Sequence, residues 1–370
     1  MSSINWVEID LSAIRNNVKR LAELAGGAEV MAVVKANAYG HGAPGVAAAA
    51  VEAGAAWLGV ARPEEALALR AAGIGASVLV MGYTPPEMTA EAIGKDVTLA
   101  VFDAETAAAY AVTAQAMGLL ARVHVKLDTG MGRLGVAAAE GPAFVRALSA
   151  LPGLAVDGVF THFAGSDSAD LGSALAQMAR FEAALGTLTA AGLRPRWVHA
   201  ANSAAIWRLP ASNYDLVRGG NALYGLDPAD EAPCPPGFRP ALAWKARVMQ
   251  VKTLPAGHGV SYGAEYVTTA QETLAVVAAG YADGFRRVPK SVNEVLLGGQ
   301  RAPVRGRVCM DQVIVSVDHI PGVRAGDEAV LLGAQGSARI SADDLARRWG
   351  TINYDVTSGI MARVERRYAE

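Results

Sequence analysis

The stretch Val30-Met31-Ala32-Val33-Val34-Lys35 (VMAVVK, residues 30–35) is an unbroken apolar run that ends in a charge, and ANAYGHG follows it. A run of this kind is typical of a strand that helices cover on both faces. Most lysines that end a strand are solvated surface charges. The small residues that follow, with the polar Asn37, Tyr39 and His41 among them, leave room for a ligand. A desolvated lysine amine there would be nucleophilic, so the interpretation depends on what else reaches the same place.

Eight apolar runs recur between residues 30 and 218, and segments rich in Ala, Leu and Glu separate them. The runs cover 30–35, 57–61, 77–82, 97–102, 121–127, 155–160, 197–201 and 214–218. The segments between them, including 63–73, 104–118 and 169–191, have Pro or Asp near their starts, which is typical of helices. Eight such alternations over about two hundred residues predict an α/β fold of the (β/α)8 TIM-type barrel class. A doubly wound open sheet is the alternative.

The sequence pattern changes near 233–237 (PCPPG), where the proline cluster predicts a linker. Runs typical of β-strands follow at 241–251, 273–281, 293–297, 301–317 and 328–332. They predict a mostly β C-terminal domain over 233–370. Because residues 6–10 are strand-like and precede the barrel, we expect residues 1–11 to join that domain and the barrel to cover 12–232.

Charge and composition argue against several classes of function. A chain of 370 residues can bury a sizeable core, and its net charge of -2 and pI near 6.3 make nucleic acid and anionic membranes poor partners. The N-terminus lacks the pattern of a signal peptide, and no apolar run is long enough to span a bilayer. Cys234 and Cys309 are the two cysteines and form no disulfide framework or metal-ligand spacing, so we expect no metal and a reducing, cytoplasmic location.

Polar residues that follow the eight runs form the candidate site, because barrel enzymes place their chemistry at the carboxyl ends of the strands. They are Lys35 and Tyr39 after the first run, Lys126 and Asp128 through Arg133 around the fifth, His162 after the sixth, Asn202 and Ser203 after the seventh, and Arg218 with Gly219 and Gly220 after the eighth. A structural role suits any one of them. Together, at one barrel mouth, they indicate a ligand-binding site.

Motifs spread along the chain resemble those of the bacterial pyridoxal-phosphate-dependent alanine racemases. They are WVEIDLSAIRNN, VVKANAYGHG, KLDTGMGRLG, THFAGSD, HAANSAA, VSYGAEY, GYADGF and GRVCMDQ, and in the family's order they extend from residue 6 to about 364. The lysine motif alone is moderately specific, whereas the tyrosine motif and CMDQ are more discriminating. The resemblance implies an isomerase that interconverts L-alanine and D-alanine and supplies D-alanine for peptidoglycan.

By this resemblance Lys35 holds pyridoxal 5'-phosphate as an internal Schiff base, and apolar surroundings help to keep its amine neutral. The other residues implied in cofactor binding are Tyr39, His162, Asn202, Ser203, Arg218, Gly220, Asn221 and Tyr354. Asn221 stands where an aliphatic residue is expected, which changes local packing but leaves its backbone N–H as a donor. Arg218 would meet the pyridine nitrogen. Because a guanidinium donates a hydrogen bond but keeps its proton, this contact limits transamination and suits racemisation.

The resemblance also implies two bases, because racemisation removes a proton from one face of Cα and returns it to the other. Lys35 would serve one face and Tyr262 the other, with His162 linking Tyr262 to Arg218. The residues implied in substrate binding are Arg133, the backbone of Met310, the nearby Asp311, and Lys126, whose position is carbamylated in many relatives. Tyr281, Arg287, Arg307 and Ile352 match positions that line a narrow entrance suited to a small amino acid.

The family's arrangement implies a homodimer with shared active sites, in which Tyr262 and Met310 complete the site of the other subunit. A serine or broader amino-acid racemase on the same fold is the alternative function, since a small group changes binding by only about 1–3 kcal/mol. A non-catalytic pyridoxal-phosphate-binding regulator is disfavoured, because such relatives generally lack a β domain with a tyrosine base.

Overall fold

The computed structural model describes residues 3–287 and 292–370, which form two compact units. The first, the barrel unit, contains Ser12–Ala38 and Ala43–Pro240. The second, the β unit, contains the N-terminal residues through Leu11, Tyr39–Gly42 and Ala241–Glu370. Residues 39–42 therefore belong to the β unit, although both their neighbours along the chain belong to the barrel unit.

Within the described residues of the barrel unit, eight parallel strands follow the order β10-β2-β3-β4-β5-β6-β8-β9, and β7 (Val136–Ala137) pairs with β6. Their bounds are β2 (Glu29–Val33), β3 (Trp57–Val60), β4 (Ser77–Val80), β5 (Thr98–Val101), β6 (Ala121–Asp128), β8 (Leu154–Phe160), β9 (Trp197–His199) and β10 (Leu216–Gly219). The edges β9 and β10 are joined by hydrogen bonds from Asp215 N to Val198 O (3.1 Å) and from Arg218 N to Ala201 O (3.0 Å). The predicted barrel is confirmed, and the open sheet is excluded.

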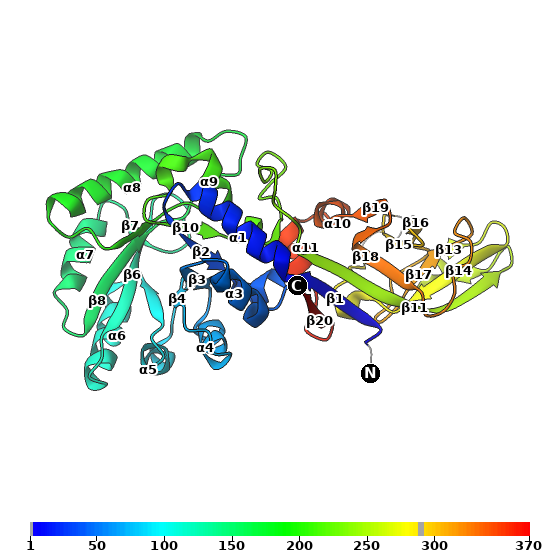
Figure 1. Ribbon diagram of the computed structural model, residues 1–370, viewed down its shortest axis with the longest axis horizontal. Helices are drawn as coiled ribbons and strands as arrows, with labels where there is room; N and C mark the ends of the chain where they lie inside the picture. The colour runs from blue at the N-terminus through cyan, green and yellow to red at the C-terminus, as the bar shows by residue number, and fades with distance from the viewer. Residues whose placement is uncertain (1–2, 288–291) are drawn as a thin grey trace. The chain divides into compact units, whose positions relative to one another are not determined.

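Helices alternate with these strands and lie on the outside of the barrel (Figure 1). They are α1 (Leu11–Ala25), α3 (Ala43–Glu52), α4 (Pro63–Ala71), α5 (Pro86–Gly94), α6 (Ala104–Ala116), α7 (Gly141–Ser149), α8 (Gly172–Ala190) and the short α9 (Ser203–Arg208). Every residue of β3, β5 and β10 is buried, as expected for strands covered on both faces. The helices expected at 63–73, 104–118 and 169–191 are confirmed. No described helix has both the length and the apolar character needed to cross a membrane.

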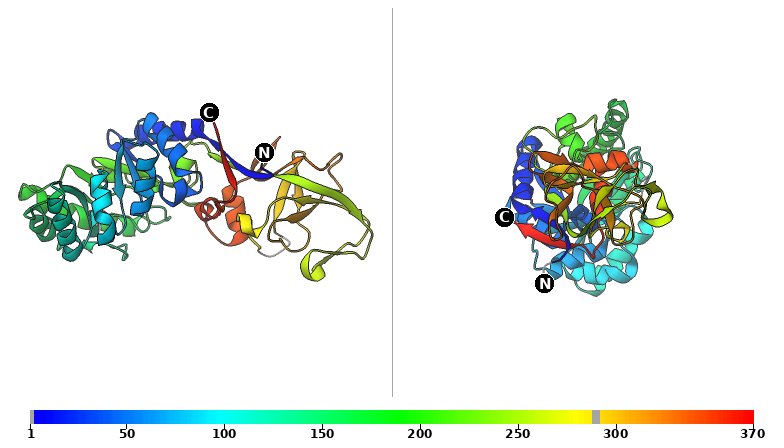
Figure 2. Two further views of the ribbon diagram at one scale, coloured as in Figure 1. Left: turned by 90° about the horizontal axis from the view of Figure 1, so that it is seen from below. Right: turned by 90° about the vertical axis from the view of Figure 1, so that its right-hand side faces the viewer.

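The β unit is built on the long strand β11 (Leu242–Leu254), coloured yellow-green in Figure 2. Its main sheet has the order β16-β15-β18-β11-β1-β20; β14 pairs with β11 and β17, and β19 pairs with β18. The bounds are β1 (Asn5–Asp10), β14 (Glu272–Val277), β15 (Glu294–Leu297), β16 (Gln300–Pro303), β17 (Val313–Ser316), β18 (Glu328–Gln335), β19 (Ala338–Ile340) and β20 (Glu365–Ala369), with helices α10 (Ala342–Trp349) and α11 (Asn353–Ser358). Because β1 pairs with β11 and β20, the expectation for residues 6–10 is confirmed.

Two expectations differ from the structure. The run 301–317 is two strands, β16 and β17, because a turn carrying the CMDQ motif interrupts it. The proline cluster is fixed to α1, since Asn16 Nδ2 donates to Gly237 O (2.8 Å) and Arg20 Nη2 donates to Pro236 O (3.2 Å). Side chains of α1 thus satisfy the carbonyls of a segment expected to be a linker, and the barrel unit extends to Pro240.

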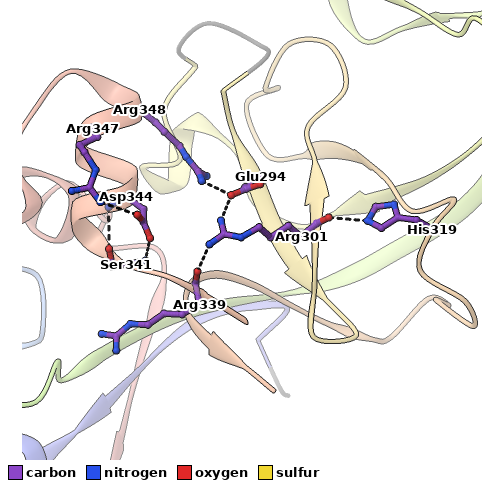
Figure 3. Close-up of polar contacts among 8 residues, drawn as sticks. All are labelled: Glu294, Arg301, His319, Arg339, Ser341, Asp344, Arg347 and Arg348. Carbon is purple, nitrogen blue, oxygen red and sulfur yellow. Dashed lines mark hydrogen bonds and ion pairs between the residues drawn. The ribbon is translucent and has the colours of Figure 1, made fainter. Parts of the chain in front are cut away.

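A polar network joins β15, β16, β19 and α10 in the β unit (Figure 3). Glu294 on β15 forms ion pairs with Arg301 on β16 and Arg348 on α10. Arg301 Nη2 also donates to Arg339 O on β19 (2.7 Å). The side chains of Glu294 and Arg348 are largely buried, so this network connects four elements within the β unit.

Candidate active site

Lys35 begins a left-handed helical turn, α2 (Lys35–Tyr39), directly after β2. Ala36, Asn37 and Ala38 have φ between 52° and 54°, and Tyr39 has φ of 52°. Left-handed backbone costs L-residues roughly 1–2 kcal/mol each, so surrounding contacts must hold it. The strand expected at 30–35 therefore ends at Val33, and the chain reverses its handedness at the lysine.

Side-chain acceptors hold this turn in place. Glu65 Oε1 accepts from Ala36 N (2.6 Å), and Asn37 Oδ1 accepts from Ala43 N (2.9 Å). Burial and the positive charge of Arg133 lower the pKa of Lys35, and the carboxylate of Glu65 partly offsets them. More of the Lys35 amine is therefore neutral and nucleophilic at pH 7 than for a surface lysine.

Arg133 lies on a glycine-rich loop that Asp128 shapes at the end of β6. The Asp128 carboxylate accepts from the backbone N–H groups of Gly130 (2.8 Å), Met131 (2.9 Å) and Gly132 (3.0 Å). Burial alone would raise the pKa of Asp128, but these hydrogen bonds lower it below its usual value. The carboxylate is thus committed to the loop, and the Arg133 side chain is exposed beyond it.

Lys126 is buried within β6, with 5% of its surface exposed. Its Nζ donates to Leu127 O (3.2 Å) and lies 5.3 Å from the centre of the Phe160 ring. Burial and the charge of Arg218 lower the pKa of Lys126 to about 7. A large fraction of this amine is therefore neutral near pH 7.

Arg218 on β10 is buried and donates to four neutral acceptors. Its guanidinium reaches Thr161 O (2.8 Å), Ala200 O (2.7 Å), His162 Nδ1 (3.3 Å) and His199 Nδ1 (2.9 Å). Burial and the charge of Arg218 lower the pKa of His162 well below its usual value. Burial also lowers the pKa of Arg218, which still remains a cation at pH 7. The predicted pairing of His162 with Arg218 is present, and His162 is a neutral imidazole.

Hydrogen bonds join Ser203 at the start of α9 to the turn that follows β10 in the barrel unit. Ser203 Oγ accepts from Gly220 N (3.0 Å) and Ala222 N (3.3 Å), so the hydroxyl hydrogen points elsewhere and can be donated to a ligand. Asn221 begins the 3₁₀ turn η2 (Asn221–Tyr224). Asn202 caps α9, and its Oδ1 accepts from Ala205 N (3.1 Å).

The β unit carries the remaining predicted cofactor residues, Tyr39 and Tyr354. Their rings meet edge to face, with centroids 6.3 Å apart. Burial, with a smaller contribution from Tyr354, raises the pKa of Tyr39 above its usual value. The Tyr39 hydroxyl therefore stays protonated and can donate a hydrogen bond.

Tyr262 lies at the tip of a small hairpin, β12 (Gly259–Val260) and β13 (Tyr266–Val267), on the turn η3 (Tyr262–Ala264). Its side chain is 66% exposed. An open cavity of about 570 Å³ is lined by residues 261–263 and 309–312, so Tyr262, Met310 and Asp311 share one surface of the β unit.

Tight packing of two turns fixes the position of Met310. Tyr281 N donates to Cys309 O (3.0 Å), and Ala282 N donates to Met310 O (2.9 Å). A Cβ atom at Gly280 would lie 2.2 Å from Met310 O, so only glycine allows this approach. The GYADGF and CMDQ motifs are therefore one structural unit, although they are far apart in the sequence.

The four predicted entrance residues are all exposed or half-buried in the β unit. Tyr281 is 39% exposed and Ile352 is 48% exposed. Arg307 forms an ion pair with Glu265, and Arg287 is exposed. In the same unit, Asp311 forms an ion pair with Arg363 (2.8 Å).

Three buried or half-buried polar residues near Lys35 and Arg218 have no sequence signal strong enough to predict their role. Glu65 anchors the Lys35 turn, His199 accepts from Arg218, and His124 Nδ1 lies 2.9 Å from His199 Nε2. A histidine within each of the apolar runs RVHVKLD and WVHAA was the available signal. Among the described residues, no group of three or more His, Cys, Asp or Glu could hold a metal ion.

Comparison with known families decides the class of this site. The family model of the alanine racemase N-terminal domain matches residues 9–228, and that of the C-terminal domain matches residues 241–368. The chain belongs to the alanine racemase family. Members of this family are racemases of the isomerase class.

Individual relatives of this chain are also racemases. An alanine racemase from Desulfovibrio desulfuricans is 46% identical over 99% of this chain and 98% of its own. The solved alanine racemase of the D-cycloserine producer Streptomyces lavendulae is 42% identical, covers 100% of this chain and 98% of its own, and superposes with a TM-score of 0.94. A solved histidine racemase from Leuconostoc mesenteroides is 30% identical, covers 99% of this chain and 98% of its own, and has a TM-score of 0.91.

Proposed function

We propose that this protein is a pyridoxal-phosphate-dependent racemase that interconverts L-alanine and D-alanine. The observation that carries the proposal is the arrangement of two residues in the barrel unit. Lys35, whose pKa is lowered, follows strand β2, and the buried Arg218 lies in the adjacent strand β10. The hydrogen-bond partners of Arg218 are neutral. This pair suits a cofactor that needs a reactive amine and a ring-nitrogen partner that keeps its own proton.

The residues present fit pyridoxal phosphate. Lys35 would hold the cofactor covalently through its amine, and Arg218 would donate to the ring nitrogen. Ser203 has a hydroxyl hydrogen left for a phosphate oxygen, and the Tyr39 hydroxyl stays protonated and so can donate as well. We assign Tyr354, Gly220, Asn221, Asn202 and His162 to the same cofactor. When bound, it supplies the electron sink that makes the substrate Cα–H acidic.

Two side chains would move the Cα proton. Lys35 accepts or returns it on one face, and its lowered pKa supports this role. Tyr262 does the same on the opposite face, where His162 stabilises the phenolate through its link to Arg218. Because His162 is neutral, it can donate a hydrogen bond without supplying a full charge.

Arg133 and the backbone of Met310 would hold the substrate carboxylate, with Asp311 beside them. Holding this carboxylate disfavours decarboxylation. We assign Lys126 to the position that is carbamylated in many relatives, and a buried amine with a pKa of about 7 suits reaction with CO2. Tyr281, Arg287, Arg307 and Ile352 would line an entrance that limits substrate size.

We infer that the active form is a homodimer with shared sites. Tyr262 and Met310 are 66% and 52% exposed on the β unit. Such exposure is unusual for a catalytic base and for a residue that holds the substrate carboxylate. Covering by a second subunit would exclude water from them, and a two-fold dimer would form two such sites. The enzyme would act in the cytoplasm, and the D-alanine that it makes would be used for peptidoglycan.

Serine or broad-specificity racemisation is the second candidate, and the match to a histidine racemase favours keeping it. A regulator that binds pyridoxal phosphate without catalysis is the weakest candidate, because this chain has the tyrosine hairpin.

The absorption spectrum tests the role of Lys35. We expect purified protein to be yellow and Lys35→Ala to lose the band of the covalently held cofactor. Lys95→Ala, at an exposed lysine of the same unit, is the matched control and should keep it. A wild type that stays colourless with added pyridoxal phosphate would contradict the proposal.

A further inference from the structure

Two fully buried histidines extend the polar chain behind Arg218. His199 on β9 and His124 on β6 are both 0% exposed. Arg218 Nη1 lies 2.9 Å from His199 Nδ1, and His199 Nε2 lies 2.9 Å from His124 Nδ1. The chain therefore joins Arg218 in β10, His199 at the end of β9 and His124 in the middle of β6.

Hydrogen-bond direction fixes the proton positions along this chain. A guanidinium only donates, so His199 Nδ1 accepts and neutral His199 carries its hydrogen on Nε2. That hydrogen is donated to His124 Nδ1, which leaves the His124 hydrogen on its own Nε2. Among the described residues, this Nε2 has no hydrogen-bond partner. Burial lowers the pKa of His124 to about 3, so both rings are neutral at pH 7.

The surrounding packing holds both rings in fixed planes. Phe160 stacks on His199, with centroids 4.7 Å apart and an interplanar angle of 2°. The ring centroids of Trp57 and His124 are 5.2 Å apart. The register of β6 and β8 shifts between Val123 and His124, a bulge of the kind that re-aims a side chain.

Gly158 on β8 leaves the room that His124 occupies. It pairs directly with His124 in the register. A Cβ atom at Gly158 would lie 2.6 Å from Cγ and Nδ1 of that ring, so any other residue would displace it. The bulge, the glycine and the aromatic rings together make a built position for one imidazole.

We propose that His199 and His124 are positioning residues for Arg218, which fix the plane of its guanidinium while leaving its positive charge uncompensated. A carboxylate at the His199 position would also orient the guanidinium, but it would neutralise the charge. A neutral imidazole orients without neutralising. The part these residues play in catalysis rests on the proposed racemase function, whereas the proton positions do not.

NMR of the holoenzyme labelled with ¹⁵N-histidine tests the proton positions. Six histidines are present, and the variants His124→Asn and His199→Asn assign the two signals. We expect both rings to be neutral at pH 7 with hydrogen on Nε2. An imidazolium, or a hydrogen on Nδ1 of His199, would overturn the proposal, because Arg218 could not then donate to that nitrogen.

Paired variants test the consequence for Arg218. Gly158→Ala should displace His124, and His124→Leu should remove the acceptor. Each is expected to shift the absorption band of the bound cofactor and to lower kcat for alanine about tenfold, with little change in KM. Gly186→Ala is the control, since nothing lies within 4 Å of a Cβ there. His124→Asn, whose Oδ1 can replace Nδ1 as acceptor, should recover most of the lost activity.

Two results would show a merely structural role. One is an unchanged band and kcat in folded Gly158→Ala or His124→Leu. The other is His124→Asn behaving no better than His124→Leu, and this comparison still decides if Gly158→Ala fails to fold. A wild type without racemase activity would instead remove the proposed function, while the NMR result would still decide the proton positions.

Discussion

At the scale of single residues, the strain beside the predicted base is the clearest feature. Ser261, which precedes Tyr262, has φ of 63° and ψ of -174°. This backbone region is essentially restricted to glycine. Ser261 Oγ donates to Arg307 O (2.7 Å), and this contact holds the strained residue in place. The hydrogen bond and this backbone conformation together set the direction in which the hairpin presents Tyr262.

Substitution of Ser261 separates strain from hydrogen bonding. Ser261→Ala and Ser261→Gly both lose the hydroxyl, but glycine relieves the strain. We expect the glycine variant to be more stable than the alanine variant by about 1 kcal/mol, after allowance for glycine's greater freedom when unfolded. Urea unfolding measures this difference. An alanine variant as stable as the glycine variant would show that the residue is not strained.

The amine of Lys126 gives a prediction about pH. Its pKa is lowered to about 7, so the neutral form dominates above that pH and the ammonium form dominates below it. Carbamylation joins neutral nitrogen to CO2 and releases one proton, so lower pH opposes it. At pH 6 the neutral fraction falls to roughly a tenth. We expect a carbamate signal in ¹³C NMR with ¹³C-bicarbonate at pH 8 that weakens by pH 6.

The control for this measurement is Lys126→Ala, which should lack the signal. If the signal persists in that variant, another amine is modified. If wild type shows none at pH 8, the assignment of Lys126 is wrong.

At the scale of elements, the Glu294 network holds α10 to the sheet of the β unit. Replacing Glu294 with Gln removes the charge that both Arg301 and Arg348 contact. We expect a loss of about 1–3 kcal/mol in the free energy of unfolding. Urea unfolding followed by tryptophan fluorescence measures it, because Trp244 and Trp349 are buried in this unit. The exposed Glu91→Gln is the control, and equal stabilities of the two variants would contradict the prediction.

Element positions were predictable where the sequence pattern is set by burial. All eight barrel strands were found, because strands covered on both faces are continuously apolar. The left-handed turn at 36–39 was not predictable, since Ala36, Asn37, Ala38 and Tyr39 contain no glycine to signal it. The split of 301–317 was not predictable either, because the turn that interrupts this run packs against Gly280, which is a contact between distant segments.

The site was predictable only where its residues follow a strand or match a motif. Lys35, Arg218 and His162 met one of these conditions, and the structure confirms that Arg218 contacts His162. His124 and His199 lie inside apolar runs, where a histidine has no position that marks its role. Their alignment depends on a bulge and on Gly158, which only the folded barrel reveals.

At the scale of the whole molecule, the proposed homodimer has residues of two chains in each active site. Inactive Lys35→Ala and inactive Tyr262→Phe should complement one another after subunit exchange. A heterodimer would contain one intact site and regain up to about half the activity of a wild-type dimer. Mass spectrometry of the intact dimers shows whether subunits have exchanged, because the heterodimer has a mass between those of the two homodimers. If exchange occurs without recovery of activity, Tyr262 acts within its own chain or is not the second base.

The central claim is racemisation of alanine, and kinetics with separate enantiomers test it most directly. Protein loaded with pyridoxal phosphate is incubated with pure L- or D-alanine, and then with each enantiomer of serine and of lysine, while chiral chromatography follows the enantiomer ratio. We predict that alanine reaches equal amounts of both forms from either side, with kcat/KM at least about tenfold above that for serine. A larger kcat/KM for serine or lysine, or unchanged alanine in protein that binds the cofactor, would contradict the account.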